Sequence, residues 1–511
     1  SRNVSPSPPV TGKRTDGRPT SWLVSNRFPI THQKLCWSYL RSPLYRVSEL
    51  EQEGASLFHH GISRLADLLL KPDLLPPEGR RFEVNNRMVF AIAAPMTLAF
   101  LTTPLLGLVD TAVVGRLGEA ALLGGLAIAA ILFDLVFTTF NFLRSSTTGL
   151  VAQAMGRDDP TEEQAVFWRS LMISVVAGVA VIAATPLLLA AGLAFMGAEG
   201  EIAAAASTYL VIRALSAPAA LANYAILGYV LGRGMGTTGL LLQTVINGTN
   251  IVLSIWLGLE LEYGLQGVAW ATVIAEVTGC LVGLAIIHVR FDRAHNPSWK
   301  QIIDRASVMR LMALNGDIMI RSFALIIAFA WFTRLGTGFG ETTLAANAIL
   351  MNFFMVAGYY LDGFATAAEQ LAGRAIGARH RPAFDKAVRL TVFWGFALAG
   401  FTTGFFLIFG EAVIGLMTTL ETVRMEAGSY LFWAALTAVA GVLAFEMDGV
   451  FVGATWSRDM RNMMLLSLVL FIGLSLALTE LWGNEGLWIS LNIFLAARGF
   501  TWLAILPRRR D

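Results

Sequence analysis

Residues 171–196, LMISVVAGVAVIAATPLLLAAGLAFM, form an unbroken run without a charged side chain. A helix of this length crosses the hydrocarbon core of a bilayer, which is about 30 Å thick. Similar runs recur along the 511-residue chain, which is 55% hydrophobic and 14% charged, with a mean hydropathy of +0.61. A soluble protein carries about a quarter of its residues charged, and a transmembrane barrel shows short alternating segments instead. The sequence therefore predicts an all-α polytopic membrane protein.

Twelve transmembrane helices are expected, in two six-helix lobes. The expected spans are residues 84–114, 120–154, 164–195, 202–231, 237–258, 264–289, 309–335, 342–373, 385–416, 424–452, 460–482 and 486–507. Residues 84–305 would form the N-lobe and residues 306–511 the C-lobe. Residues 1–83 would be an N-terminal extension.

The two halves of the chain repeat each other in sequence. A pattern of Tyr-Leu, Ala-Leu and two glycines occurs without a gap at residues 209–232 and again at 430–453. Shorter matches follow in the same order, at 116–118 with 334–336, 150–156 with 371–377, and 264–267 with 483–486. Because six spans per half is an even number, the repeat is parallel, and its axis lies along the membrane normal. Such lobes place a substrate cavity between or within them near the midplane.

The charge of the connections predicts the orientation. One side carries Arg116, Arg334 and Arg424, whereas the other collects most of the remaining Lys and Arg, including the C-terminal run at 508–510. The positive-inside rule then predicts that both termini are cytoplasmic. We expect a multi-pass protein of a bacterial inner membrane.

The N-terminal extension allows two interpretations. Residues 1–48 hold eight Lys and Arg, one acid and many Ser and Pro, which predicts loop or disorder. They are typical of a transit peptide, which would place the protein in an organellar envelope. Alternatively, they are translated upstream sequence, since none of the 17 Met precede Met88. We favour the second interpretation, in which a chain that starts at Met88 or slightly upstream inserts and exports normally.

Several functional classes are disfavoured by composition. Cys36 and Cys280 cannot support a disulfide framework, and the six histidines fall outside the apolar runs, with His288 at the very end of the sixth, so no intramembrane metal or haem site is expected. A net charge of +2 without a separate basic domain argues against nucleic acid. No G-x-x-x-x-G-K-[ST] motif occurs, so transport would be driven by an ion gradient, and no cofactor is expected.

Polar side chains within the spans are the candidate functional residues, because an ionisable group at mid-bilayer costs roughly 2.5 to 3.5 kcal/mol unless it faces a cavity or a partner. In the N-lobe these are Asp134 and Asn141, which share one face of the second span, Gln243, Asn247 and Asn250 in the fifth span, and Glu276 in the sixth. A role in a cavity or in a buried pair is favoured for Asp134. Hydrogen bonding between helices and cavity lining stay equally open for the fifth-span residues and for Glu276.

Secondary candidates occupy the C-lobe. Tyr359, Asp362 and Glu369 share one face of the eighth span, and Asp448 lies in the tenth, two residues from Glu446 on a different face.

Two charge pairs and three prolines also enter the predictions. Asp317 and Arg321, one turn apart, predict a local ion pair. Arg144 and Asp362, at similar repeat positions, would pair across the halves or reach the inner interface. The mid-span prolines Pro95, Pro104 and Pro218 lie in the first half and favour bending there.

Four stretches resemble the DinF-like branch of the multidrug and toxic compound extrusion (MATE) family. They are PMT at 95–97 leading to VDTAVVG at 109–115, FLRSSTTGLVAQ at 142–153, LDGF at 361–364, and DGVFVGAT at 448–455. The resemblance covers about residues 86–506. It implies two six-helix lobes in a V and export of lipophilic, often cationic, compounds by alternating access driven by protons or sodium.

The resemblance also carries the family's first-helix acid onto Asp110. Many relatives have Asp four residues after the fifth-helix Asn250, where this chain has Ser254. A two-carboxylate ion site is therefore in doubt. Asp110 would bind a proton and a cationic substrate in turn.

These observations predict a secondary active efflux transporter that exchanges protons or sodium for lipophilic, cationic small molecules. We expect a monomer whose partners are its substrates and the lipid bilayer. A flippase for lipids or lipid-linked precursors, of the same wider superfamily, is the alternative. It is disfavoured because phosphate head groups call for a basic cavity and the deep charges are mostly acidic. An enzyme would need a His, Cys or metal constellation within the spans.

Overall fold

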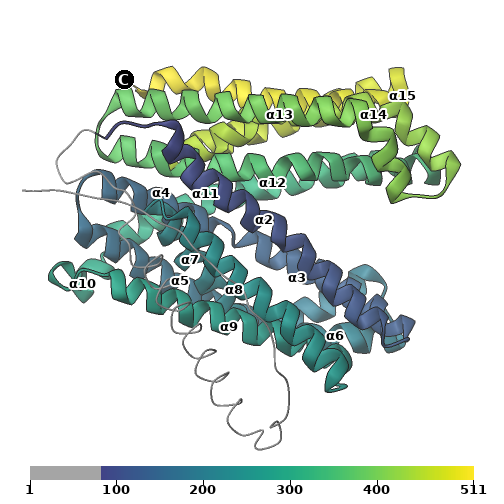
Figure 1. The fold of residues 1–511 in the computed structure, drawn as a ribbon, viewed down its shortest axis with the longest axis horizontal. Coiled ribbons are helices and arrows are strands. Elements are labelled where there is room, and N and C mark those ends of the chain that lie inside the picture. The colour runs from purple at the N-terminus through teal and green to yellow at the C-terminus, as the bar shows by residue number, and fades with distance from the viewer. Residues whose placement is uncertain (1–81, 511) are drawn as a thin grey trace, which may run out of the picture. The chain divides into compact units, whose positions relative to one another are not determined.

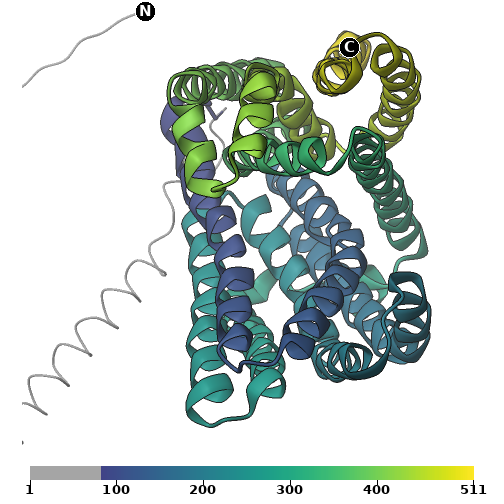
Figure 2. The same ribbon diagram turned by 90° about the vertical axis from the view of Figure 1, so that its right-hand side faces the viewer.

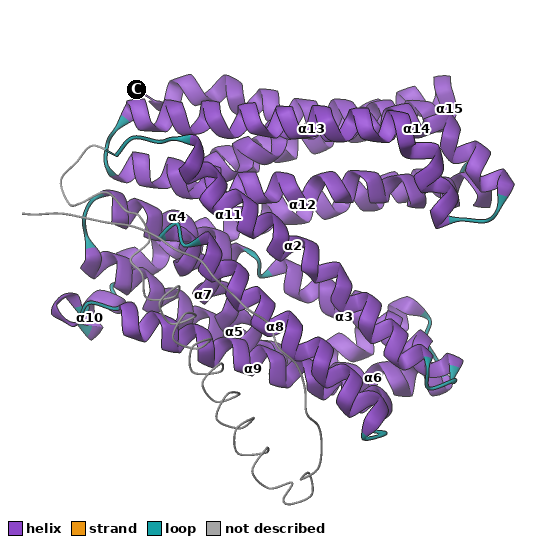
Figure 3. Ribbon diagram, in the orientation of Figure 1, coloured by secondary structure: helices purple, strands orange, loops and turns teal. Residues whose placement is uncertain are grey.

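The computed structural model describes residues 82–510, with side chains to Leu506, and every regular element in this range is helical (Figure 3). The predicted extension, residues 1–83, lies outside the described residues except for Phe82 and Glu83. The elements are α2 (Asn86–Gly115), α3 (Ala120–Thr139), α4 (Phe142–Gly156), α5 (Pro160–Met196), α6 (Gly200–Ala214), α7 (Ala217–Gly232), α8 (Gly236–Ile255), the π-helix η1 (Trp256–Glu260), α9 (Gly264–Arg290), the 3-10 helix η2 (Arg293–His295), α10 (Trp299–Ile302), α11 (Arg305–Thr337), α12 (Glu341–Gly377), α13 (Arg381–Met417), α14 (Glu421–Gly453) and α15 (Ser457–Arg510).

The described helices account for the twelve predicted spans. Ten helices or continuous helix pairs are long and apolar enough to cross a membrane, and α6 with α7, bent by 52°, makes an eleventh. The long α15 contains two spans, because Gly483 (φ 56°, ψ −136°) interrupts its helical path. The first bundle comprises α2 to α9, and the second comprises α11 to α15.

Within the described chain, the bent helix pair lies in the first bundle, as the prolines predicted. The bend follows Ala214, just before Pro218 near the start of α7. Proline lacks the backbone N–H of a continuous helix and disfavours helical geometry at the preceding residue. By contrast, α2 stays helical through both Pro95 and Pro104.

The internal repeat is visible in how glycines bring helices together. A Cβ on Gly228 of α7 would meet the carbonyl oxygen of Arg144 on α4, and a Cβ on Gly449 of α14 would meet that of Ala365 on α12. Gly228 and Gly449 occupy equivalent positions of the repeat, and so do Arg144 and Ala365. Small residues at such positions let membrane helices approach closely, so the two bundles use the same packing twice.

The bundles meet along a contact that we call the glycine seam, formed by Gln153 and Gly156 of α4 with Gly373, Arg374 and Gly377 of α12. Gly156 faces the Arg374 carbonyl and Gly377 faces the Gln153 carbonyl, so each helix presents the same repeat positions to the other. From this seam the two bundles diverge toward their opposite ends (Figures 1 and 2).

A hydrogen bond strengthens this end of the interface. The Gln153 side-chain amide donates to the Gly453 carbonyl at 2.9 Å and to the Thr455 hydroxyl at 3.2 Å. Both acceptors belong to the end of α14 or the turn that follows it.

Helix α2 belongs to both bundles. It packs against α8 in the first and against α12 in the second. The α12 contact is close, because Gly363 abuts the Ala93 carbonyl and the Thr97 side chain.

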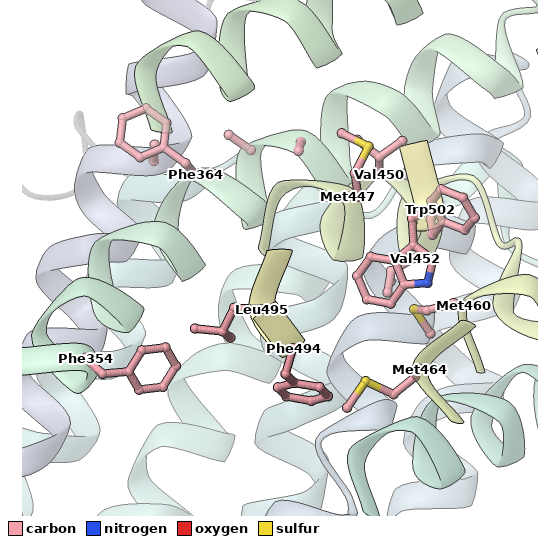
Figure 4. Packing of buried hydrophobic residues seen from close by; sticks show 14 of the residues in the cluster. Phe354, Phe364, Met447, Val450, Val452, Met460, Met464, Phe494, Leu495 and Trp502 are labelled. Atoms are coloured by element: carbon pink, nitrogen blue, oxygen red, sulfur yellow. The ribbon is translucent and has the colours of Figure 1, made fainter. Parts of the chain in front are cut away.

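The largest apolar core lies in the second bundle (Figure 4), where Met464, Phe494 and Trp502 of α15 are among its buried members. Phe82 and Val84, which precede α2, are buried in the same core.

Candidate functional site

The first bundle encloses a cavity of about 420 Å³, which we call the acidic cavity. Its charged lining consists of the carboxyl groups of Asp110, Asp134 and Glu276 and the guanidinium of Arg213. Three acids thus face one base in a space walled by α2, α3, α6, α8 and α9 of the first bundle, together with Tyr359 of α12. Such an arrangement suits a cationic guest.

Asp110 lies in the last turns of α2 and is 8% exposed. The Ser254 hydroxyl of α8 donates to its Oδ1 at 2.9 Å. Beside it, the Asn250 amide donates to the Thr272 hydroxyl at 2.8 Å, while Asn250 Oδ1 has no hydrogen-bond partner in the described chain. The site therefore offers one carboxylate together with neutral oxygens.

Arg213 of α6 is the basic group of the acidic cavity. Its Nη1 donates to the Tyr209 hydroxyl at 3.2 Å, and its guanidinium carbon lies 3.7 Å from the centre of the Phe133 ring. No carboxylate among the described residues lies within 4.0 Å of it. Arg213 thus offsets the three acids without being tied to one of them.

Glu276 and Asp134 line the cavity in different ways. Glu276 accepts a hydrogen bond from the Asn223 amide of α7 at 2.7 Å, which fixes its carboxylate. Asp134 on α3 is exposed to the cavity.

A second cavity of about 330 Å³, the central cavity, lies between the two bundles. Its lining holds three guanidinium and three carboxyl groups, those of Arg144, Arg321, Arg498, Asp362, Glu369 and Asp448. Tyr359 of α12 lines both cavities.

Two of the central arginines are paired with acids. Arg321 of α11 forms an ion pair with Asp448 of α14, in which Nε donates to Oδ1 at 2.9 Å. Arg144 of α4 lies 3.6 Å from Glu369 of α12, across the interface between the bundles.

The predicted local ion pair between Asp317 and Arg321 is wrong. Asp317 accepts instead from Arg461 Nη1 at 2.6 Å and from the Ser457 hydroxyl at 2.7 Å, both on α15. Partners on neighbouring helices offer better geometry than a residue one turn away, where side chains compete with solvent and give only a few tenths of a kcal/mol.

The predicted equivalence of Arg144 and Asp362 is also wrong. The seam pairs Gly156 with Gly377 as equivalent positions of α4 and α12, and counting back from them makes Asn141 the counterpart of Asp362. Arg144 Nε donates to Asn141 Oδ1 at 3.2 Å, and its acidic partner is Glu369.

The polar stripe of the second span is divided between the cavities. Asp134 lines the acidic cavity, whereas Asn141 lines the central cavity. Asp134 belongs to α3, which ends at Thr139, and Asn141 lies directly before α4, which begins at Phe142, so the stripe extends from one cavity to the other.

The polar residues of the fifth span, Gln243, Asn247 and Asn250, also have different surroundings. Asn250 lines the acidic cavity, but Gln243 donates to Asn247 at 3.0 Å and Asn247 to the Thr102 hydroxyl at 2.6 Å, so these two join α8 to α2. Pro104 of α2 borders the acidic cavity, and Pro95 lies nearer the start of α2.

The expectation that deep charges are mostly acidic holds for the acidic cavity, whereas acids and bases are equal in number in the central cavity. The sequence analysis did not predict Arg213 and Arg498, although each lies alone within an apolar run, at residues 202–231 and 486–507. A lone arginine within an apolar run indicates a cavity or a partner, because the energetic cost of an intramembrane acid applies equally to arginine. Thr272, a neutral residue on the sixth span, gave no such signal.

Two six-helix bundles with polar cavities inside and between them define a two-lobed, multi-pass membrane transporter. The MatE family model matches residues 95–256 and 318–477, and the chain belongs to this family of transporters, which are not enzymes.

Several relatives support the assignment. The chain is 37% identical to DNA damage-inducible protein F of Escherichia coli (strain K12) over 425 residues, covering 83% of this chain and 92% of that protein. It is 27% identical over 429 residues to Protein DETOXIFICATION 44, chloroplastic, of Arabidopsis thaliana, covering 80% of each.

Solved structures confirm the fold. A MOP superfamily transporter from Pyrococcus furiosus superposes with a TM-score of 0.76 at 19% identity, covering 83% of this chain and 95% of that chain. An outward-facing multidrug resistance MATE family transporter gives a TM-score of 0.75 at 21% identity, covering 82% and 95%.

Proposed function

We propose that this transporter exports lipophilic, cationic small molecules in exchange for protons. The observation that carries the proposal is the acidic cavity, in which Asp110 is buried beside Ser254 and the three acids outnumber the single arginine. A cation entering this space meets a net negative lining without having to break an ion pair first. No cofactor takes part in this scheme.

The proton is proposed as the coupling ion because Asp110 has a hydroxyl neighbour where a second acid would favour a metal cation. A single buried carboxyl can bind and release a proton with no further ligands, as intramembrane acids do in proton relays. A sodium ion, by contrast, gives up its water only when several oxygens replace it.

Competition between proton and substrate would then produce exchange. Protonation of Asp110 removes the charge that attracts a cation, and deprotonation restores it. Because alternating access opens the cavity to one side at a time, proton entry on one side would release substrate there. Deprotonation on the other side would prepare the site for the next molecule.

The orientation follows from the basic connections. The turns after α4 and α12 carry Arg157 and Arg379, and α15 begins with Ser457 and Arg458, at the same end as the glycine seam. We propose that this end and both termini are cytoplasmic, so the seam closes the inner side and the structure faces outward.

The remaining organisation is proposed on the same basis. Residues 84–305 act as the N-lobe and residues 306–511 as the C-lobe of a monomer in a bacterial inner membrane. An organellar envelope is the alternative location, since names of plant relatives carry the word chloroplastic.

The test is dye efflux into inverted vesicles under an imposed pH gradient and, separately, a sodium gradient. The pH gradient should drive accumulation and the sodium gradient should not. Asp110→Asn should insert normally and lose at least 90% of this transport, roughly tenfold, because the neutral amide cannot exchange a proton, whereas Asp110→Glu should keep part of it. Glu201→Gln, at an exposed acid of α6, is the matched control and should transport normally. Normal pH-driven transport by Asp110→Asn would overturn the proposal.

A flippase remains the second candidate, because the central cavity holds three guanidinium groups that can bind phosphate. Fluorescent phospholipids in reconstituted vesicles separate the two functions. Gradient-independent translocation of lipid, without dye transport, would favour the flippase.

A further inference from the structure

Arg498 of α15 stands apart from the other arginines of the central cavity. Arg144 and Arg321 have carboxylate partners, but no carboxylate of residues 82–506 lies within 4.0 Å of Arg498. Its side chain lines the cavity although the residue is only 3% exposed, and Nε has no hydrogen-bond partner in the described chain. Its contacts are the rings of Phe494 and Trp502, 5.7 and 5.4 Å from the guanidinium carbon to their centres.

Asp362 of α12 is the complementary group. It also lines the central cavity, its residue is exposed there, and no ion pair within 4.0 Å involves it among the described residues. Asp362 and Arg498 line the same cavity without forming an ion pair with each other. One free acid and one free base therefore face the same space.

The ring contacts do not offset the free-energy cost of burying the charge of Arg498. Each cation–π contact contributes about 0.5 to 2 kcal/mol, whereas removing a charged group from water costs several kcal/mol even after relaxation. The guanidinium has five donors in a planar fork that matches a carboxylate or phosphate. An oxyanion from a ligand would supply the missing partner.

We propose that the central cavity binds zwitterionic compounds, with Arg498 holding their oxyanion and Asp362 their ammonium or other cationic group. The proposal rests on the export function above and names a class of substrate for it. A volume of about 330 Å³ lies within the range of small-molecule sites. The acidic cavity has three acids and a single base, so its charges do not match the equal positive and negative charges of a zwitterion.

Binding of a matched dye pair tests the proposal. Rhodamine 110 carries a free carboxylate, and rhodamine 123 is its methyl ester, so the two differ only at the group that Arg498 would recognise. Fluorescence polarisation with the purified full chain in detergent needs no ion gradient. Arg498→Gln should weaken rhodamine 110 binding by about tenfold or more, as expected for a lost charge-assisted hydrogen bond, and leave rhodamine 123 within about twofold. Asp362→Asn should weaken rhodamine 110 as well.

The control is Arg389→Gln, at an exposed arginine of α13, which should bind both dyes like the wild type. Arg498→Lys keeps the charge but not the planar fork, so it should lose affinity for rhodamine 110 alone, and it decides the matter if Arg498→Gln does not fold. For Arg498→Gln, or for Arg498→Lys if the former does not fold, equal losses for both dyes, or no loss for rhodamine 110, would overturn the proposal.

Two further measurements separate the possible explanations. Competition by dihexanoyl phosphatidylethanolamine would identify a lipid head group as the natural zwitterion, and its absence would point to a soluble compound. Asp110→Asn should keep the preference for rhodamine 110 even if it abolishes transport, so failure of the coupling scheme leaves this test intact.

Discussion

Ser254 determines how many acids the proposed ion site at Asp110 contains. Ser254→Asp would place a second carboxylate beside Asp110, next to the oxygens of Asn250 and Thr272. We expect this variant to gain sodium binding, because two acids with neutral oxygens attract a cation that replaces its water. Its melting temperature in detergent should rise in sodium chloride relative to choline chloride.

The wild type should show no such difference between the two salts. Ser254→Asp combined with Asp110→Asn, which restores a single acid, should lose the sodium effect. An identical melting temperature in both salts for Ser254→Asp alone would contradict the prediction.

The pair of Arg321 with Asp448 joins α11 to α14, and each side chain is 16% exposed. Asp448→Asn should destabilise the fold by about 3 kcal/mol, because it leaves a largely buried arginine without its acid. Arg321→Met combined with Asp448→Leu should recover most of that stability. A double-mutant cycle by chemical denaturation measures the coupling, and additive effects of the two single changes would show that the pair contributes nothing.

At the residue scale, the sequence identified most of the charged lining but not its partners. Asp134 and Glu276 were predicted because an acid in an apolar run is conspicuous, Asp110 was predicted from the resemblance to the MATE family, and the structure gathers all three in one cavity. Partners were not predictable, since Arg321 and Asp448 are far apart in the chain and no local pattern connects them.

At the scale of elements, the segment before α2 proves part of the folded unit. Phe82 and Val84 are 4% and 0% exposed, and Asn85 caps α2 by accepting from Met88 N at 3.0 Å. A chain that begins at Met88 should therefore melt at a lower temperature than one that begins at Phe82, since each lost apolar side chain contributes roughly 1.5 to 3 kcal/mol. Thermal unfolding of the two purified proteins measures the difference.

The chain that begins at Phe82 is the control for loss of the extension itself, because it should export dye as well as the full chain. Equal melting temperatures for the two truncations would show that Phe82 and Val84 contribute nothing. The prediction that Met88 is a sufficient start rested on the absence of a spanning segment before it, which says nothing about buried residues outside the spans.

Span lengths were predictable because they follow directly from apolar runs, and the limits agree within a few residues for most helices. The positions at which helices are interrupted were harder to predict from the sequence. Pro218 indicates the bend between α6 and α7. The interruption between α3 and α4, however, occurs within a run that has no proline or glycine near Asn141. The backbone of Asn141 stays in the helical region, so α3 and α4 still form one continuous span.

At the scale of the described unit, the glycine seam must separate if the protein alternates between two open states. Cysteines at Ala152 and Gly373 should lock it, because a Cβ on Gly373 would lie 2.9 Å from the Ala152 Cβ, and a small shift reaches the separation of about 3.5 to 4.5 Å found in disulfides. With Cys36 and Cys280 replaced by serine, oxidation should abolish dye transport and a reductant should restore it.

Each single-cysteine variant, treated with the same oxidant, should keep its activity. Full transport by a completely cross-linked protein would mean that the seam stays closed throughout the cycle. The repeat match of residues 150–156 with residues 371–377 already contained the equivalent positions of the seam, but nothing in the sequence indicated that these two stretches contact each other.

The position of Tyr359 in the wall of both cavities bears on the design of inhibitors. A compound with a basic group in the acidic cavity, an acidic group on Arg498 and a short linker past Tyr359 would occupy two sites with one molecule. Its second contact would form at the high effective concentration that a linker provides. Because it would hold α9 of one bundle and α15 of the other, such a compound would resist the movement that carries a substrate across, and would act as a blocker rather than as cargo.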